Sequence, residues 1–352
     1  MSSPKKSPLK PQPRPDESGG STSTSAELRL RRGARRALLL ERLTRHLPLP
    51  ILRASLQAVR FAALLGPWRV RIHDNLKLAF GDELNDRTRR KLSKDCFKHS
   101  ARIASEWLLL SHIQRGGRKA ERAKRWVVDN VSFDDSYSHL EAALKEDCGV
   151  MLATAHIGNW ELLGARLASE GTRRGVTPVA IGLDRHGWLR RLRASYGVES
   201  LPQNISPRRL LEVLKAGRPI AVLADMEVRR LAGSFLPFFG VDALTMTAPA
   251  ALARSASCVI LPARCYIPPG EDSYRISFDA PLSLRPELSR KEGTLQLMRE
   301  LNLVYEAWIR ETPEQWAWYQ PRWRTRPGTL EAIPLHARLD RPELPGAYDG
   351  NR

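Results

Sequence analysis

Short apolar runs alternate with amphipathic segments in the second half of the chain. The apolar runs, which are typical of buried strands, cover residues 148–155, 176–183, 220–224, 258–267 and 274–278. Apolar positions at helical spacing predict helices over 159–169, 207–215 and 246–256, and a long helix that contains residues 295–308. Strands that alternate with helices indicate an α/β fold, with a mostly parallel central sheet flanked by helices and a helical N-terminal region.

The same pattern divides the chain into four regions. Residues 1–25 are rich in proline, serine and lysine and contain few groups to bury, so we expect a disordered basic tail. Residues 26–140 are predicted to be mainly helical, and residues 141–330 to form the α/β core. Residues 331–352 are again rich in proline and charge and are expected to trail along the surface.

The segment 51–65 resembles a helix that lies on a membrane. Arg53, Gln57 and Arg60 share one narrow stripe, the remaining positions are mostly apolar, and Gly66 and Pro67 end the helix. Its length of roughly 22 Å is too short to cross a bilayer, so we expect an interfacial helix whose arginines meet lipid phosphates. A helix packed on the domain is the alternative. We find neither a signal peptide nor a run of about 18 apolar residues.

The charge of the chain indicates an anionic partner. Lys and Arg number 57 against 38 Asp and Glu, which gives a net charge of +19 at pH 7. Nucleic acid, an acidic membrane surface and an acidic carrier protein all fit this charge. The basic residues are dispersed and no nucleic-acid motif is recognised, so we expect no nucleic-acid partner, although a basic nucleic-acid-binding protein is kept as an alternative. The hydrophobic content of 42% excludes a wholly disordered or fibrous protein.

The cysteines carry no metal signal. The four of them are widely spaced and form no C-x-x-C pair, which favours a reduced compartment over a zinc site. We therefore expect no metal and no other cofactor.

One segment brings together residues suited to acid–base chemistry. His156 follows the first predicted strand directly, at the carboxyl end where open α/β sheets bind ligands, and Glu161 comes five residues later. Gly158 allows a tight turn, and Asn159 is a good helix cap. A carboxylate that orients the imidazole would make His156 a better base. From the spacing alone, a structural histidine at a strand end is the more frequent arrangement.

Further segments in the same order resemble a known family. The segment His-Ile-Gly-Asn-Trp-Glu at 156–161 is similar to the histidine–four residues–acid signature of the bacterial lipid A biosynthesis acyltransferases. Three other boxes of that family have counterparts at Asn75–Phe80, at Asp225 with 233–240 and 245–247, and at Pro313–Trp318 with Arg322 and Trp323. The resemblance covers roughly residues 40–327. Departures occur at Gly81, at Met226 and in the arginines of the segment 51–65.

The resemblance implies transfer of a fatty acyl group from an acyl-thioester, on acyl carrier protein, to a hydroxyl of a lipid A precursor or related glycolipid. It implies His156 as general base with Glu161 as its partner, and a location on the cytoplasmic face of the cell inner membrane, in contact with its lipid surface. The backbone N–H groups near Gly158 and Asn159, or an arginine, are candidates for stabilising the oxyanion.

Five further residues are expected to bind substrate, namely Asn159, Asp225, Arg264, Phe238 and Phe239. Asp225 ends an apolar strand and could orient the acceptor, or serve only as a turn residue. Arg264 lies within a strand and could bind a phosphate, while Phe238 and Phe239 could line an acyl groove or belong to the core. A basic patch is expected around Trp188, from the arginines 185, 190, 191 and 193.

Two alternatives within enzyme chemistry stay open. The same reaction could act on another glycolipid, such as a mannosylated phosphoinositide. A hydrolase could instead use His156 and Glu161 to activate water.

Overall fold

The structure, a computed structural model, describes residues 67–327 except 147, 175–177, 183–186, 203–204, 228–232 and 284. The two tails and the segment 51–65 therefore lie outside the described residues. None of the helices within the described ranges is long and apolar enough to cross a membrane.

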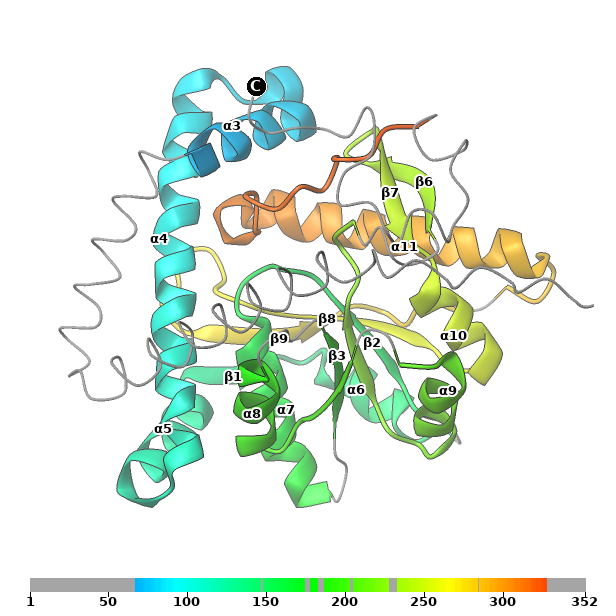
Figure 1. Cartoon of the computed structure of the whole chain (residues 1–352). Helices are drawn as coiled ribbons and strands as arrows, with labels where there is room; N and C mark the ends of the chain where they lie inside the picture. Colours follow the sequence, from blue (N-terminus) through cyan, green and yellow to red (C-terminus); the bar gives the residue numbers. More distant parts are fainter. Residues whose placement is uncertain are drawn as a thin grey trace, which may run out of the picture. The chain divides into compact units, whose positions relative to one another are not determined.

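The expected α/β fold with a mostly parallel sheet is confirmed (Figure 1). Seven strands form the sheet in the order β1-β9-β8-β2-β5-β3-β4, and only the β8–β9 pair is antiparallel. The strands of this sheet are β1 (Val131–Phe133), β2 (Met151–Thr154), β3 (Val179–Gly182), β4 (Glu199–Pro202), β5 (Ile220–Leu223), β8 (Ile260–Tyr266) and β9 (Tyr274–Phe278). The described helices are α3 (Pro67–Phe80), α4 (Asp86–Ser111), α5 (Gly117–Asn130), α6 (Tyr137–Ala143), α7 (Trp160–Arg174), α8 (Trp188–Ser195), α9 (Pro207–Lys215), α10 (Ala248–Ala256) and α11 (Arg290–Glu311).

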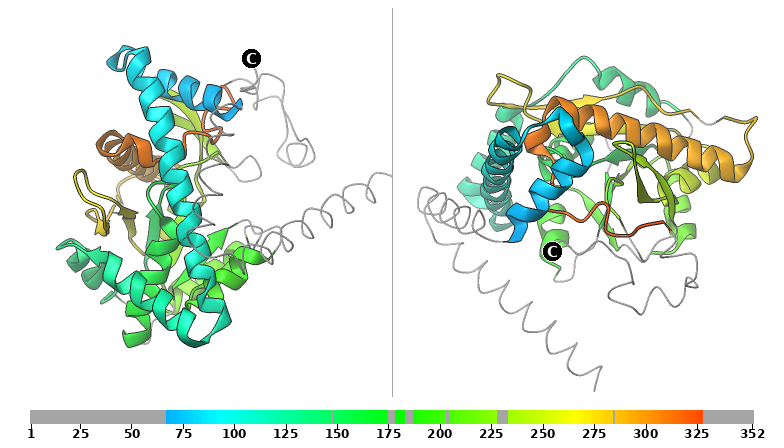
Figure 2. Two further views of the ribbon diagram at one scale, coloured as in Figure 1. Left: turned by 90° about the vertical axis from the view of Figure 1, so that its left-hand side faces the viewer. Right: turned by 90° about the horizontal axis from the view of Figure 1, so that it is seen from above.

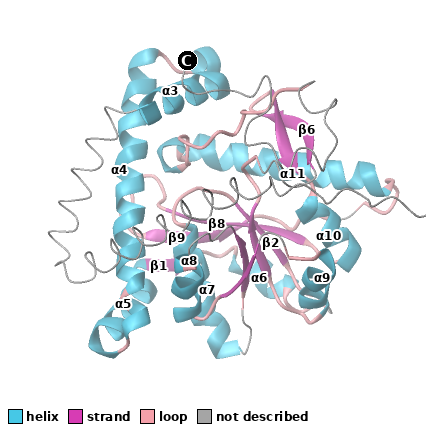
Figure 3. Cartoon of the chain, in the orientation of Figure 1, coloured by secondary structure: helices cyan, strands magenta, loops and turns pink. Residues whose placement is uncertain are grey.

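The two faces of the sheet belong to two hydrophobic cores. Met151 and Ala153 of β2 pack in one core with residues of α9, α10 and α11, while Leu152 between them packs in the other with residues of α5, α6, α7 and α8. This alternation is the period of two that an extended strand imposes on its side chains. Helices accordingly cover both faces of the sheet (Figure 3).

Local sequence signals fix several helix ends. Ser206 caps α9 by accepting a hydrogen bond from the backbone N–H of Arg209, and Pro207 follows at the first helical position. The predicted range 207–215 is the observed one. Ser289 and Glu292 form a reciprocal capping box that begins α11.

The phenylalanine-rich family box at 233–240 begins a hairpin. Strands β6 (Gly233–Phe238) and β7 (Val241–Met246) pair antiparallel outside the main sheet. Phe239 and Gly240 connect them with φ values of 53° and 69°, as a two-residue turn of type I′ requires. The hairpin packs against α11, as the view from above shows (Figure 2).

The predicted helical region also contributes to the sheet. Its strand β1 pairs with β9 and forms one edge of the sheet. The long helix α4 runs past the sheet beside the rest of the domain (Figure 2).

The connections of β2 and β5 create a crevice between these two neighbouring strands. The chain leaves β2 through α7 on one face of the sheet and reaches β3 on the far side of β5. It leaves β5 through α10 on the opposite face and reaches β8 on the far side of β2. Such a reversal opens a crevice outside the carboxyl ends of the strands, where α/β proteins bind their ligands.

Candidate active site

His156 and Asp225 meet across this crevice. His156 follows β2 and Asp225 follows β5, and the His156 Nδ1 atom lies 2.8 Å from Oδ1 of Asp225. The backbone N–H of His156 donates to the other carboxylate oxygen, Oδ2, over 2.8 Å. The carboxylate thus holds both the ring and the main chain of His156.

Asp225 is a buried carboxylate that its neighbours keep ionised. Its side chain is 0% exposed, and the indole Nε1–H of Trp316 donates to Oδ2 at 2.8 Å. Burial by itself raises the pKa of Asp225, but the charge of His156 and the hydrogen bonds from His156 and Trp316 outweigh it, so that the pKa lies below its usual value. The pair is therefore a carboxylate beside an imidazole.

The geometry leaves one nitrogen of His156 available for chemistry. A carboxylate only accepts hydrogen bonds, so Nδ1 carries the proton and Nε2 carries the lone pair. The side chain of His156 is 22% exposed, and its ring packs edge-on against Trp160 with the centroids 4.9 Å apart. The arrangement is that of a general base oriented by a buried acid.

The turn that carries His156 is held from both sides by backbone hydrogen bonds. The backbone N–H of Gly158 donates to the carbonyl of Gln315 at 3.0 Å, and that of Asn159 to the carbonyl of Cys265 at 2.8 Å. Gly158 has a φ of +57°, and a Cβ atom there would lie 1.9 Å from the Cys265 oxygen. Glycine is required because of both the conformation and this close approach.

These bonds bear on the predicted oxyanion donors. The N–H groups of Gly158 and Asn159 already donate to carbonyls of the protein, so the prediction that they face a substrate oxyanion is wrong. Their part is to fix the turn.

Glu161 takes part in a different cluster from the one expected. Both its oxygens accept from Arg193, Oε1 at 2.6 Å and Oε2 at 3.0 Å, and Oε2 also accepts from the hydroxyl of Tyr196 at 2.6 Å. The prediction that Glu161 orients His156 is wrong, since Asp225 occupies that place. The reason is geometric: Glu161 lies in the first turn of α7, and α8 places an arginine beside it.

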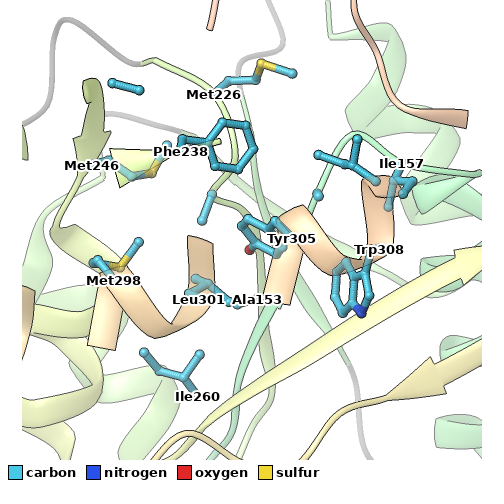
Figure 4. Close-up of a cluster of buried hydrophobic side chains, with 14 of the residues drawn as sticks. Ala153, Ile157, Met226, Phe238, Met246, Ile260, Met298, Leu301, Tyr305 and Trp308 are labelled. Atoms are coloured by element: carbon cyan, nitrogen blue, oxygen red, sulfur yellow. The ribbon is translucent and has the colours of Figure 1, made fainter. Parts of the chain in front are cut away.

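Three of the residues expected to bind substrate are placed in the interior. Asn159 is 0% exposed and its amide is hydrogen-bonded to Trp107 and Glu106. Phe238 and Phe239 are 0% and 7% exposed and belong to the main hydrophobic core, part of which is drawn in Figure 4. They contact protein rather than line a groove, because the hairpin turns them inward under the C-terminal segment.

Arg264 is likewise bound within the protein. Its guanidinium donates to Glu311 at 2.7 Å and to the hydroxyl of Ser277 at 3.1 Å, and it stacks over the ring of Tyr266 at 3.7 Å. The side chain is 9% exposed and its Nη1 atom has no hydrogen-bond partner among the described residues, so phosphate binding by Arg264 stays a prediction.

The expected arginine patch around Trp188 is also reduced. Arg193 is buried against Glu161, Arg190 and Arg191 are exposed on α8, and Arg185 lies outside the described residues.

The C-terminal box supplies contacts that sequence reasoning missed. It crosses the His156 turn, because the backbone N–H of Ala317 donates to the carbonyl of His156 at 3.0 Å. Trp316 then reaches Asp225. The only signal for this contact was the resemblance of the Pro-Glu-Gln-Trp segment to a family box.

The N-terminal box joins the same assembly. The amide of Asn75 donates to the carbonyls of Trp318 and Gln320 at 2.7 and 3.0 Å. The ring of Phe80 packs against Phe239 and Trp318, with the centroids 5.3 and 5.7 Å apart. Segments some 240 positions apart in sequence therefore brace one another around His156.

An apolar cavity lies between the central strands and the helices α9 and α10. Its volume is ≈ 370 Å³. It is lined mainly by aliphatic side chains of β2, β3, β5, α9 and α10, among them Met151, Val222, Leu210, Ala251 and Leu252. Its shape and lining suit an alkyl chain better than a sugar or a nucleotide.

No group of three or more His, Cys, Asp or Glu side chains in the part of the chain that the structure describes could hold a metal ion.

Comparison with known proteins agrees with the geometry. Residues 37–325 match the family described as bacterial lipid A biosynthesis acyltransferase. The phosphatidylinositol mannoside acyltransferase of Mycolicibacterium smegmatis is 30% identical over 204 residues, which are 56% of this chain and 62% of that protein. That of Mycobacterium tuberculosis H37Rv is 33% identical over 136 residues, 36% of this chain and 42% of that protein. The matches to these mycobacterial relatives thus span less than two thirds of their length.

A relative outside the mycobacteria matches over a longer stretch. The lipid A biosynthesis lauroyltransferase of Escherichia coli K12 is 26% identical over 280 residues, 75% of this chain and 80% of that protein.

Proposed function

Because the chain belongs to the bacterial lipid A biosynthesis acyltransferase family, we propose that it transfers a fatty acyl group from a thioester donor to a hydroxyl of a glycolipid. The observation that carries the proposal is the pair His156–Asp225 at the crevice between β2 and β5. We further propose acyl carrier protein as the donor and the cytoplasmic face of the inner membrane as the location, which the net charge of +19 supports.

The reaction follows from the free nitrogen of His156. Nε2 takes the proton of the acceptor hydroxyl while its oxygen attacks the thioester carbonyl, so that a C–O bond forms. The tetrahedral intermediate collapses, the C–S bond breaks, and the departing thiolate receives the proton from the imidazolium. Asp225 stabilises the imidazolium in between, and a positioned base of this kind contributes roughly 10²- to 10⁴-fold.

The apolar cavity supplies a place for the acyl chain. Each buried methylene contributes about 0.8 kcal/mol, so a lining of aliphatic side chains binds a fatty chain without polar contacts. Ala251, which is partly exposed in this lining, offers a test. We expect Ala251→Trp to shift the preferred acyl chain towards shorter lengths, measured with a series of acyl donors; an unchanged preference would place the chain elsewhere.

Two acceptors are supported by different observations. Identity of 30% favours a mannosylated phosphoinositide, as in the mycobacterial relatives, whereas the longer match to the lauroyltransferase favours a lipid A precursor. Both present a hydroxyl to the same base.

Acyl transfer is tested with the full chain and lauroyl and palmitoyl acyl carrier protein, in vesicles that contain either acceptor. Mass spectrometry of the extracted lipid should show one added acyl chain with the wild type and a loss of about 10²-fold or more with His156→Gln. His73→Gln on α3, whose side chain is 31% exposed, is the matched control and should keep full activity. Free fatty acid without acylated lipid would indicate a hydrolase and overturn the proposal.

A further inference from the structure

A second buried carboxylate faces the His156 turn from α4. Glu106 is 6% exposed and lies 53 positions before Asn159 in the sequence. Its Oε2 accepts from the amide nitrogen of Asn159 at 2.8 Å and from the hydroxyl of Tyr274 at 2.7 Å. Its Oε1 accepts from Nε of Arg102 at 2.9 Å. Glu106 thereby accepts from three donors, one of which belongs to the turn.

Asn159 transmits this contact to the turn and to α7. Its Oδ1 accepts from the indole of Trp107 at 3.2 Å and from the backbone N–H of Leu162 at 3.3 Å, while its Nδ2 donates to Glu106. The acceptor and donor sides of the amide are therefore fixed in one orientation. Asn159 lies between Gly158 and Trp160 in the chain. Its position therefore sets the turn that bears His156, and it also sets the place of the Trp160 ring, which packs against His156.

The network around Glu106 borders a cavity. A cavity of ≈ 770 Å³ lies between α4 and the β8–β9 turn, and Glu106, His99 and Gln315 line it. His99 lies 3.4 Å from the carbonyl of Gly158, and the Gln315 carbonyl accepts from the Gly158 N–H. Residues that line this cavity thus also contact the turn.

We propose that Glu106 is a positioning residue for acyl transfer: through Asn159 it holds His156 at the place where Nε2 meets the acceptor hydroxyl. The inference rests on the function proposed above. Displacement of the turn by a fraction of an ångström would lower turnover while leaving substrate binding largely intact, since rate depends steeply on the alignment of reacting atoms.

Exchanging the two partners provides the test. In Asn159→Asp two carboxylates meet at the same place, which breaks the contact. In Glu106→Gln the side-chain oxygen can take the place of Oε2 and keep the hydrogen bonds from Asn159 and Tyr274, with its NH₂ group turned towards Arg102. The double variant Glu106→Gln/Asn159→Asp restores an amide–carboxylate hydrogen bond in the reverse direction. It also keeps one negative charge in the network, and Tyr274 can accept instead of donate.

The expected result is a kcat that falls about 10- to 100-fold in Asn159→Asp, falls less in Glu106→Gln, and recovers to within about threefold of wild type in the double variant, with KM for the donor changed less than threefold. Tyr274→Phe is the matched control, because it removes a donor from the same oxygen but keeps the Asn159 contact. Its kcat should stay within about threefold of wild type. Thermal denaturation of each variant establishes the folded fraction to which kcat refers.

A further variant covers the case in which the single variants do not fold. Glu106→Asp keeps the charge but withdraws the carboxylate by one methylene, and its kcat should fall about tenfold. Wild-type kcat in Glu106→Asp or in Asn159→Asp, or a double variant no better than Asn159→Asp, would overturn the positioning role while leaving the proposed function standing. A wild type that acylates neither acceptor would overturn the proposed function and this inference together.

Discussion

Asp225 and Glu161 are two buried carboxylates, 0% and 2% exposed, with different partners. Asp225 is paired with an imidazole that reaches the solvent, whereas Glu161 is paired with the buried guanidinium of Arg193. An imidazole can gain and lose a proton near neutral pH, and a guanidinium cannot. The partner, more than the carboxylate, therefore separates a site for chemistry from a structural ion pair.

The largest expected effect is the loss of turnover when Asp225 is replaced, which distinguishes Asp225 from Glu161. In Asp225→Asn the oxygen can keep the bonds to Trp316 and to the His156 backbone, but the amide NH₂ then donates to Nδ1. The proton of the ring moves to Nε2, which loses its function as a base, so kcat should fall by about 10⁴-fold. Label transfer from the acyl donor measures kcat, and a loss below tenfold would mean that Asp225 is not the partner that matters.

Glu161→Ala should lower the stability of the fold and have little effect on turnover. It leaves Arg193 buried without its carboxylate and Tyr196 without its acceptor, so the free energy of unfolding should fall by about 3 to 5 kcal/mol. The kcat of the folded fraction should change less than tenfold. Urea denaturation measures the first and label transfer the second.

The matched control replaces the whole ion pair. Glu161→Leu with Arg193→Met should recover most of the lost stability, because it leaves no buried charge behind. If Glu161→Ala instead abolished turnover at unchanged stability, the contrast between the two carboxylates would be lost.

His99 can be compared with His156. Its neighbours are Arg102 and a backbone carbonyl. Burial lowers its pKa to about 4, aided by the charge of Arg102 and opposed by the carbonyl of Gly158. The unfolded chain, with a histidine pKa of about 6.5, then binds more protons than the folded chain between these two values. Stability should therefore fall as the pH falls from about 7, by about 2 kcal/mol at pH 5.

The variant His99→Gln should lack this part of the acid sensitivity. Urea denaturation at pH 7.5 and pH 5 measures it, with His73→Gln as the control. An equal loss of stability in His99→Gln and in the wild type would show that another group is responsible.

The smallest effect concerns the third hydrogen bond to Asp225. Trp316→Phe removes the indole donor at 2.8 Å, which should lower kcat about tenfold and raise the pKa of Asp225, moving the acidic limb of the pH–rate profile to higher pH. Trp318→Phe is the matched control: that indole donates to the carbonyl of Pro313 at 2.6 Å and makes no such change at Asp225. Equal pH profiles in the two variants would contradict the role of Trp316.

Much of the fold could be predicted because its signals are local. Apolar runs of strand length and the cap at Ser206 determined β2, β5, β8 and α9 closely. The hairpin β6–β7 was missed because its turn uses Phe239, a residue that rarely adopts a positive φ, and because its strands mix polar and aromatic positions. β1 and β4 are short edge strands, for which three or four residues give too little pattern.

The candidate site was predicted in part. His156 was identified from its place after an apolar strand, and Asp225 was singled out by the same reasoning at the end of another strand. Their contact could not be derived, because strand order decides which strand ends are neighbours and 69 residues separate the two.

The sequence by itself determined the class of fold, the family and His156 as the candidate base, because helix caps, strand periods and motif residues act over a few positions. Only the tertiary structure decided which carboxylate serves His156, why Glu161 is held by α8, and how α4 and the C-terminal box fix the turn. Those contacts join segments far apart in the chain, and their geometry depends on how the sheet and its helices pack.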